Sequence, residues 1–283
     1  MRRLKATQGG IVGLWIAVLT LLCFATPATA ITWGWPDGEL HRNVGAMVLY
    51  DALNDQWFQG CSGTLIHKYM FLTAGHCTAW VENYDVTEIR VNFAQDALDF
   101  SDPTTWREVD IVVTHPDYAW LARSDIHDVG VLILKEPVLD REPAKLPKLG
   151  LLDQLKKQKK LRQGSEEEDF VVVGYGATLH WPPSPPNPRH TYDHCRQFAF
   201  SEYQALLPAW LRMSQNHATD DGGSCYGDSG GPAFWIDPQG REILVGITSW
   251  GDVPCVATGF NYRTDIPQTQ DFLLWVYENC VAQ

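Results

Sequence analysis

Short runs of β-branched and aromatic residues, separated by turn residues, recur along the chain. The clearest runs predict strands, and they lie at residues 44–50, 88–93, 129–134, 170–173 and 243–248. Frequent short strands bounded by Gly, Pro, Asn and Asp are typical of an all-β protein built from barrels or a sandwich. The hydrophobic pattern therefore predicts a β protein with many turns.

Three segments depart from the strand pattern. Residues 270–281 place Phe272, Leu273, Val276 and Cys280 on one helical face, which predicts a short helix packed on the second half of the chain. Residues 151–169 are rich in Lys and Glu and predict an exposed linker or a solvated surface loop. The Pro-rich residues 181–188 predict an extended surface loop.

The first thirty residues have the pattern of a secretory signal peptide. Arg2, Arg3 and Lys5 precede an apolar run, and Ala28-Thr29-Ala30 is a small-x-small cleavage sequence. The apolar run, residues 11–25, is shorter than the roughly 20 residues that a membrane-spanning helix needs. We therefore expect a signal peptide at 1–30 and a mature chain, 31–283, that is secreted and not held in a membrane.

Composition and charge narrow the class of protein. Twelve Trp, ten Tyr and eleven Phe supply more buriable aromatic surface than a disordered chain carries. The formal net charge of −12 argues against nucleic acid as a partner, because phosphate backbones select basic surfaces.

Cysteine usage agrees with export. Six cysteines follow the predicted signal peptide, an even number that suits disulfides in an oxidising compartment but leaves fifteen possible pairings. A zinc site is the alternative, but the chain has no C-x-x-C or H-E-x-x-H motif. We expect no metal and no cofactor.

The strongest chemical signal surrounds Ser229. In Gly227-Asp228-Ser229-Gly230-Gly231-Pro232, residues without Cβ let a substrate carbonyl approach the hydroxyl and let backbone N–H groups point inward. Gly-x-Ser-x-Gly also marks the nucleophile elbow of α/β-hydrolases, in which the base follows the serine in the chain. Because all the histidines precede Ser229, that fold is excluded.

A serine hydroxyl needs a base and a group that orients the base. Thr73-Ala74-Gly75-His76-Cys77 offers His76 among small residues, and Asp128 stands at the start of an apolar strand. Asp125 is the competing acid, and its polar neighbours suggest a solvated loop side chain.

Together with Ser249-Trp250-Gly251, these motifs resemble the trypsin/chymotrypsin family of serine endopeptidases. The resemblance covers nearly the whole mature chain and implies two antiparallel six-stranded β-barrels with a short C-terminal helix. The N-terminal barrel would take up about 31–150, a linker about 151–169, and the C-terminal barrel and helix about 170–283. The site would lie between the barrels.

The resemblance also implies roles for single residues. His76, Asp128 and Ser229 would form the catalytic triad, and the N–H groups of Gly227 and Ser229 the oxyanion hole. Substrate would bind against a larger set of residues, namely Gly223, Ser224, Ser249, Trp250, Gly251 and Gly259. Because Gly223 stands where trypsin has an aspartate, specificity for Lys or Arg is not expected. We expect instead a roomy, uncharged pocket that accepts large apolar side chains.

Activation and disulfides follow from the same resemblance. Cleavage after Ala30 would free the Ile31 amine to pair with Asp228, so that export itself activates the enzyme. Two family bridges have their cysteines here, Cys61–Cys77 and Cys225–Cys255, and the remaining cysteines suggest Cys195–Cys280.

We therefore predict a secreted, monomeric serine endopeptidase that acts on protein or peptide substrates. Two alternatives stay open: an inactive homologue that only binds, and a serine esterase on the same fold.

Overall fold

The computed structural model describes residues 31–83, 86, 88–120, 124–164, 170–179 and 190–282. The predicted signal peptide and the Pro-rich loop lie outside the described residues. No helix in the described part of the chain is long and apolar enough to cross a membrane.

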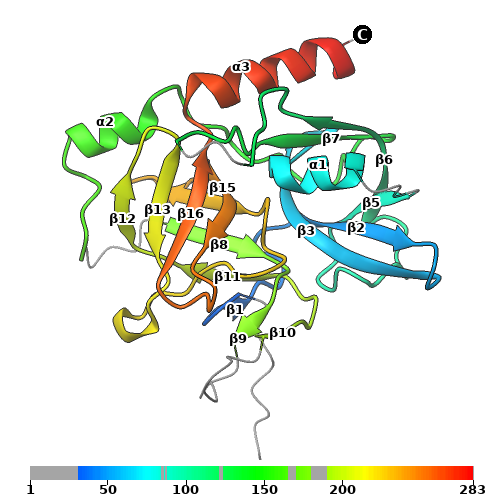
Figure 1. Ribbon diagram of the computed structural model, residues 1–283, viewed down its shortest axis with the longest axis horizontal. Coiled ribbons are helices and arrows are strands. Elements are labelled where there is room, and N and C mark those ends of the chain that lie inside the picture. The colour runs from blue at the N-terminus through cyan, green and yellow to red at the C-terminus, as the bar shows by residue number, and fades with distance from the viewer. Residues whose placement is uncertain are drawn as a thin grey trace, which may run out of the picture.

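The first half is a closed six-stranded antiparallel barrel (Figure 1). Its strands, paired in the order β2-β3-β4-β7-β6-β5, are β2 (Val44–Asp51), β3 (Gln56–His67), β4 (Met70–Thr73), β5 (Ile89–Asn92), β6 (Trp106–Thr114) and β7 (Gly130–Leu134). Helix α1 (Gly75–Asn83) follows β4 directly. The strands predicted at 44–50, 88–93 and 129–134 are confirmed as β2, β5 and β7.

The second half is a strongly curved eight-stranded sheet with the order β1-β11-β8-β14-β15-β16-β13-β12. Its strands are β1 (Trp35–Pro36), β8 (Phe170–Gly174), β11 (Gln197–Phe200), β12 (Tyr203–Leu206), β13 (Trp210–Ser214), β14 (Pro232–Ile236), β15 (Glu242–Gly251) and β16 (Thr258–Arg263). A separate two-stranded ribbon pairs β9 (Thr178–Leu179) with β10 (His190–Thr191), and a 3₁₀ turn spans His217–Thr219. The strands predicted at 170–173 and 243–248 are confirmed as β8 and β15.

Chain continuity forces this sheet to curl. Strands β11 and β12 lie near opposite ends of the sheet order, yet only Ser201 and Glu202 separate them in the chain. The Ser201 N–H donates to Phe170 O of β8 at 3.1 Å, and the Ser214 N–H of β13 donates to Glu202 O at 2.8 Å. One bent strand therefore joins both ends of the sheet, which curls the second half into a half-barrel beside the closed first barrel.

A buried arginine ties the N-terminal segment and both halves together. Arg196, 1% exposed, forms an ion pair with buried Asp37 at 2.7 Å. Its guanidinium also donates to Phe93 O at 2.9 Å, in the first half, and to Gly38 O at 2.8 Å. Because a guanidinium has a fixed fork of donors, it satisfies several buried acceptors at once. This contact helps to fix one barrel against the other.

The segment after the first half differs from the prediction. Residues 151–157 were expected in an exposed linker or loop, but they form helix α2 (Leu151–Lys157) with Leu152 and Leu155 buried. The two leucines are three residues apart, so they share one helical face and join the apolar cluster of the second half. The Lys side chains dominated the sequence pattern, but they occupy only the outer face.

The C-terminal helix is also placed differently. Helix α3 (Pro267–Val276), continued by a π-helical turn at Tyr277–Val281, begins on the second half and runs over the first (Figure 1). Phe272 packs on the His115 ring at 5.0 Å, and the Tyr277 ring meets His67 at 5.3 Å. Phe272, Leu273 and Val276 of the predicted apolar face are buried and Cys280 is partly buried, but this face does not rest on the second half alone.

Two of the three predicted disulfides are present, Cys61–Cys77 and Cys225–Cys255. Cys195 and Cys280 are free cysteines, so the predicted third bridge is wrong. Cys195 follows β10, and Cys280 lies in the π-helical turn that continues α3. Figure 1 shows β10 at the bottom of the view and α3 at the top. Crossing of α3 to the first half separates the two cysteines.

Candidate active site

His76 and Asp128 are brought together by the pairing of β4 with β7. Thr73 pairs with Gly130 at the end of this ladder, so the chain leaves β4 toward His76 at the point where it enters β7 from Asp128. Gly75 allows the close approach, because a methyl group there would lie 2.9 Å from Val129 N. Small residues around the histidine, noted in the sequence, therefore serve this contact.

The carboxylate of Asp128 holds His76 at two points. Oδ1 accepts the His76 backbone N–H at 2.8 Å, and Oδ2 lies 2.9 Å from Nδ1 of the ring. The Ser249 hydroxyl also donates to Oδ2. Asp128 is fully buried, whereas the His76 side chain keeps 22% exposure toward the cleft. The imidazole is thus fixed with Nδ1 on the acid and Nε2 directed away from it.

Electrostatics favour charge on this pair. Burial raises the pKa of Asp128, but the charge of His76 and hydrogen bonds from His76 and Ser249 outweigh it, so the net shift is downward. Burial lowers the pKa of His76, but the Asp128 charge and hydrogen bond outweigh it and raise the pKa above 6.5. An anion that stabilises imidazolium suits a histidine that must take up a proton.

Asp125, the competing acid, has a different partner. Its Oδ1 accepts the Tyr262 hydroxyl at 2.8 Å, so it is not the solvated side chain that the sequence suggested. The hydroxyl comes from β16, far away in the chain, and no local pattern pointed to it.

The turn that carries Ser229 docks on the first barrel. Ser229 O accepts the Ser62 N–H of β3 at 2.8 Å, next to Cys61, whose disulfide holds the residue after His76. Gly230 has φ +84°, and a methyl group there would lie 2.0 Å from Thr73 Oγ1. A glycine is therefore required both for this backbone conformation and for the close approach. His76 and Ser229 line the same two cavities of the cleft.

The backbone around Ser229 leaves donors unused. Gly227 has φ +93°, and its carbonyl accepts Gln59 Nε2 at 2.7 Å and Ser62 Oγ at 3.0 Å. Within the described part of the chain, the N–H groups of Gly227 and Ser229 have no hydrogen-bond partner. Gln59 and Ser62 come from β3, and the sequence analysis missed both. Two free N–H groups beside a hydroxyl can bind an oxyanion.

Asp228 and Ile31 are both fully buried. The Asp228 carboxylate accepts the Gly176 N–H at 2.7 Å and the Cys225 N–H at 2.8 Å. Burial raises the pKa of Asp228 to about 8, although these two hydrogen bonds oppose the rise. In the uncut chain the Ile31 nitrogen belongs to a peptide bond and offers no charge to this carboxylate.

The side chain of Gln215 lies against two of the glycines that were expected to line the substrate pocket. Gly223 and Gly259 both face the side chain of Gln215, since a methyl group on Gly223 would lie 2.3 Å from Gln215 Cγ and one on Gly259 would lie 2.8 Å from Nε2. Ser224 O and Oγ accept from Nε2 at 2.7 and 3.3 Å. Gln215, a residue outside the motifs, therefore occupies space that these two glycines were expected to leave open.

Ser249, Trp250 and Gly251 form the end of β15. Strand β14 pairs with β15 only as far as Ile247, whereas β16 continues to Gly251. The last residues of β15 therefore lack a neighbouring strand on one side. An extended peptide can pair with such an open strand edge and add a strand to the sheet. The Trp250 ring stacks on Phe260 at 3.7 Å and stays 45% exposed.

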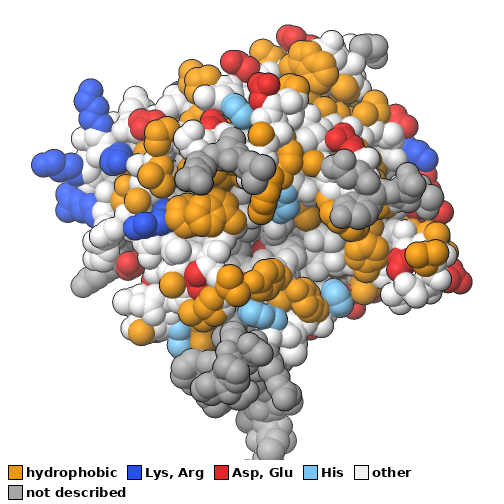
Figure 2. Space-filling model, viewed as in Figure 1, with side chains coloured by type: hydrophobic (Ala, Val, Ile, Leu, Met, Phe, Trp, Pro, Cys, Tyr) orange, Lys and Arg blue, Asp and Glu red, His pale blue; other side chains and the backbone are white. Residues whose placement is uncertain are grey.

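The larger of the two cavities that Ser229 lines is mostly apolar and has a volume of about 1090 Å³. It is lined by Met47, Leu49, Phe58, Gln59, Gly60, Cys61, His76, Cys77, Ala79, Trp80, Tyr118, Trp120 and Ser229. The Trp120 ring meets the His76 ring edge-on at 6.1 Å, a contact that the sequence did not suggest. Hydrophobic side chains gather around the middle of the face in Figure 2, while Lys and Arg collect at the left, over α2.

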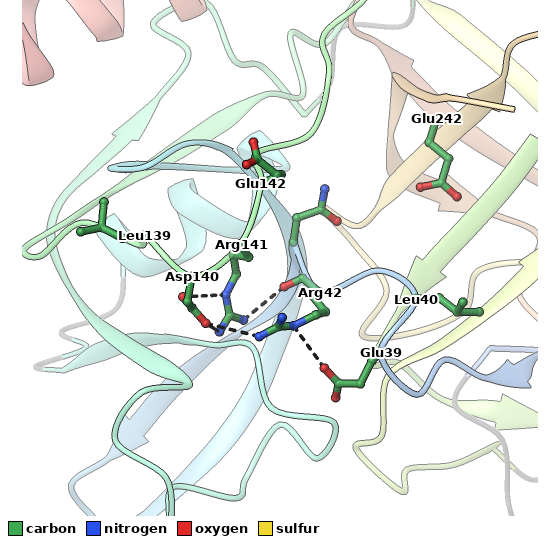
Figure 3. A pocket seen from close by; sticks show the side chains of 9 residues that line it. Glu39, Leu40, Arg42, Leu139, Asp140, Arg141, Glu142 and Glu242 are labelled. Atoms are coloured by element: carbon green, nitrogen blue, oxygen red, sulfur yellow. Dashed lines mark hydrogen bonds and ion pairs between the residues drawn. The ribbon is translucent and has the colours of Figure 1, made fainter. Parts of the chain in front are cut away.

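A third cavity, of about 450 Å³, is lined mostly by charged residues (Figure 3). Asp140 lies 2.6 Å from Arg141 and 3.5 Å from Arg42, which also lies 3.2 Å from Glu39. None of the predicted site residues lines it. Arg42 and Arg141 are thus paired with carboxylates of the same cavity, which indicates a structural role for these charges.

A family model described as Trypsin matches residues 45–275. The chain belongs to the trypsin family. This trypsin-family chain is 29% identical over 241 residues to serine proteinase stubble of Drosophila melanogaster, covering 77% of this chain and 27% of that protein. It is 27% identical over 197 residues to transmembrane protease serine 11C of Mus musculus (68% and 42%). It is 30% identical over 220 residues to kallikrein-15 of Homo sapiens (72% and 75%).

The chain spans between about a quarter and three fifths of the first curated relatives it matches. The first two of these relatives carry the names of serine proteases. Membership of the trypsin family therefore agrees with the two-barrel fold and with the residues gathered in its cleft.

Proposed function

We propose that this chain is a secreted serine endopeptidase that hydrolyses peptide bonds of protein substrates through a covalent acyl-enzyme. The observation that carries the proposal is His76, which two hydrogen bonds to Asp128 orient and which lines the same two cavities as Ser229. Ser229 Oγ attacks the scissile carbonyl, and His76 takes the hydroxyl proton and delivers it to the leaving amine. Asp128 keeps the Nδ1–H tautomer and stabilises the imidazolium.

The N–H groups of Gly227 and Ser229 bind the oxyanion of the tetrahedral intermediate. Their lack of other partners supports this role, as do the contacts of Gln59 and Ser62 with the Gly227 carbonyl. Losing one such donor typically costs roughly 3–4 kcal/mol of transition-state stabilisation. The unpaired edge at Ser249–Gly251 aligns the substrate backbone as an added strand.

Specificity for Lys or Arg is not part of the proposal. Gly223 contributes no side chain to the pocket, and Asp252, which lines the cavity, already accepts the N–H groups of Val256, Ala257 and Thr258. A basic side chain would therefore find no free carboxylate among these residues. An uncharged substrate residue before the scissile bond fits better.

Cleavage after Ala30 activates the enzyme in this proposal. The new Ile31 amine provides the positive charge that buried Asp228 lacks, and the burial of both residues supports this pairing. N-terminal sequencing of the secreted protein tests this step. A mature chain that begins at a residue other than Ile31 contradicts it.

Casein hydrolysis by the secreted protein tests the proposed function. We expect the wild-type protein to release peptides from fluorescent casein and Ser229→Ala to release none. Hydrolysis of small esters without hydrolysis of any peptide would instead identify an esterase. If Ser229→Ala retained both activities, Ser229 could not be the nucleophile.

A further inference from the structure

Gln215 is a polar residue in an unusual place. It follows β13, is 2% exposed, and lies against three of the glycines expected to open the substrate pocket. Besides its contacts with Gly223 and Gly259, its Oε1 lies 3.8 Å from the point where a methyl group on Gly251 would stand. Three glycines thus leave a space, and one glutamine fills it.

The carboxamide is locked in one orientation. Ser224 O can only accept a hydrogen bond, so the atom 2.7 Å from it is the nitrogen Nε2. Oε1 is then the other atom, and it is buried without a partner within the described part of the chain. The backbone N–H of Gln215 is held by Ala257 O at 3.1 Å. The side chain therefore cannot swing away without losing its hydrogen bond to Ser224.

The cavity beside Ser229 stops short of Gln215, which is not among the described residues that line it. Ser224 and Gly251 line the cavity, but Gly223 and Gly259, which face Gln215, are not among the described residues that line it. We infer that Gln215 is a specificity-determining residue: it is the floor of the primary pocket and restricts it to small, uncharged substrate side chains such as Ala, Ser or Val. The inference rests on the proposed function, because the pocket has this meaning only if Ser229 is the nucleophile.

Volume, rather than charge, is the physical basis of the selection. A buried amide filling the deep end excludes a long or aromatic side chain by overlap, and it offers no charge to Lys or Arg. A single methylene in an enzyme pocket changes kcat/KM by roughly 10–200-fold, so a filled floor separates Ala from Phe strongly.

Matched peptide substrates that differ only in the residue before the scissile bond test the inference. With Ala, Val, Phe and Arg at that position, we expect wild-type kcat/KM for Ala or Val to exceed that for Phe and Arg at least tenfold. Gln215→Ala removes the floor, and we expect the Phe/Ala ratio to rise at least tenfold. Gln215→Met keeps an unbranched side chain of similar length but loses the hydrogen bond, and it should keep the wild-type order.

Several results would overturn the inference. These are a wild-type preference for Phe or Arg, an unchanged ratio in Gln215→Ala, or a shift in Gln215→Met as large as that in Gln215→Ala. If Gln215→Ala does not fold, the wild-type order and Gln215→Met still decide. Labelling of Ser229 by a sulfonyl fluoride separates the two claims: labelling with the wrong order of peptides refutes only the pocket, whereas no labelling and no hydrolysis refutes the proposed function and the pocket with it.

Discussion

Replacing Asp128 with Asn tests how the acid controls His76. The His76 backbone N–H, 2.8 Å from Oδ1, can only donate, so this position must keep the oxygen of the new amide. The NH₂ group then takes the place of Oδ2, 2.9 Å from His76 Nδ1. Because the NH₂ group donates, Nδ1 becomes the acceptor and the ring proton moves to Nε2. A protonated Nε2 cannot accept the proton of Ser229.

The expected loss is large. A serine protease whose triad histidine is held in the wrong tautomer loses about 10⁴-fold in kcat, which corresponds to about 5.5 kcal/mol of transition-state stabilisation. Substrate binding should change little, since Asp128 is buried behind His76. Steady-state kinetics on a matched peptide, with active sites counted by a serine reagent, would measure both effects.

The pH profile gives a second readout. Asp128 raises the pKa of His76 above 6.5, so wild-type kcat/KM should increase with pH and reach half its maximum above pH 6.5. In Asp128→Asn, which lacks the carboxylate, this rising limb of the pH profile should move to lower pH. Asp125→Asn is the matched control, because Asp125 bonds to Tyr262 rather than to His76, and it should leave both rate and limb unchanged. A loss below tenfold in Asp128→Asn, or an equal loss in the control, would refute the reasoning.

Three further predictions concern stability. Burial raises the pKa of Asp228 from 3.8 to about 8 in the uncut chain, so the stability that its protonated carboxyl contributes is present below about pH 4 and is lost as pH rises through 8. Calorimetry on uncut Ser229→Ala should therefore show a Tm that falls over this pH range, and the added change Asp228→Asn should remove the fall. Parallel plots of Tm against pH for the two proteins would contradict this. Replacing Cys225 and Cys255 with Ser opens a loop of 30 residues and should cost about 3–4 kcal/mol in urea unfolding, whereas an unchanged midpoint would count against it. Arg196→Met leaves the buried Asp37 carboxylate without its guanidinium partner and should lower the free energy of unfolding by about 3 kcal/mol. Arg42→Met, at an exposed ion pair, is the control and should lower it by less than about 1 kcal/mol. Equal losses in the two variants would show that burial of the Arg196 pair is unimportant.

Sequence motifs predicted the parts of the site that depend on local backbone. His76, Asp128 and Ser229 each lie beside a strand end or a glycine turn, so small neighbours and chain order were enough to select them as candidates. The same holds for the strands β2, β5, β7, β8 and β15, whose β-branched runs are fully or largely buried.

Features that depend on distant contacts were missed. Gln215 has no motif, and its role as a filler appears only when Gly223, Gly251 and Gly259 converge on it. The bridge between Cys195 and Cys280 was predicted by elimination, which ignores the path of α3 across the first half. Helix α2 was not predicted, because its polar and charged residues outnumber its two buried leucines.

Covalent labelling tests the central claim most directly. We predict that a sulfonyl fluoride adds one group to the secreted protein, that peptide mapping places it on Ser229, and that His76→Ala reduces the labelling rate by several orders of magnitude while the fold is retained. Labelling at another residue, or an equal rate in His76→Ala, would contradict the proposal that His76 activates Ser229.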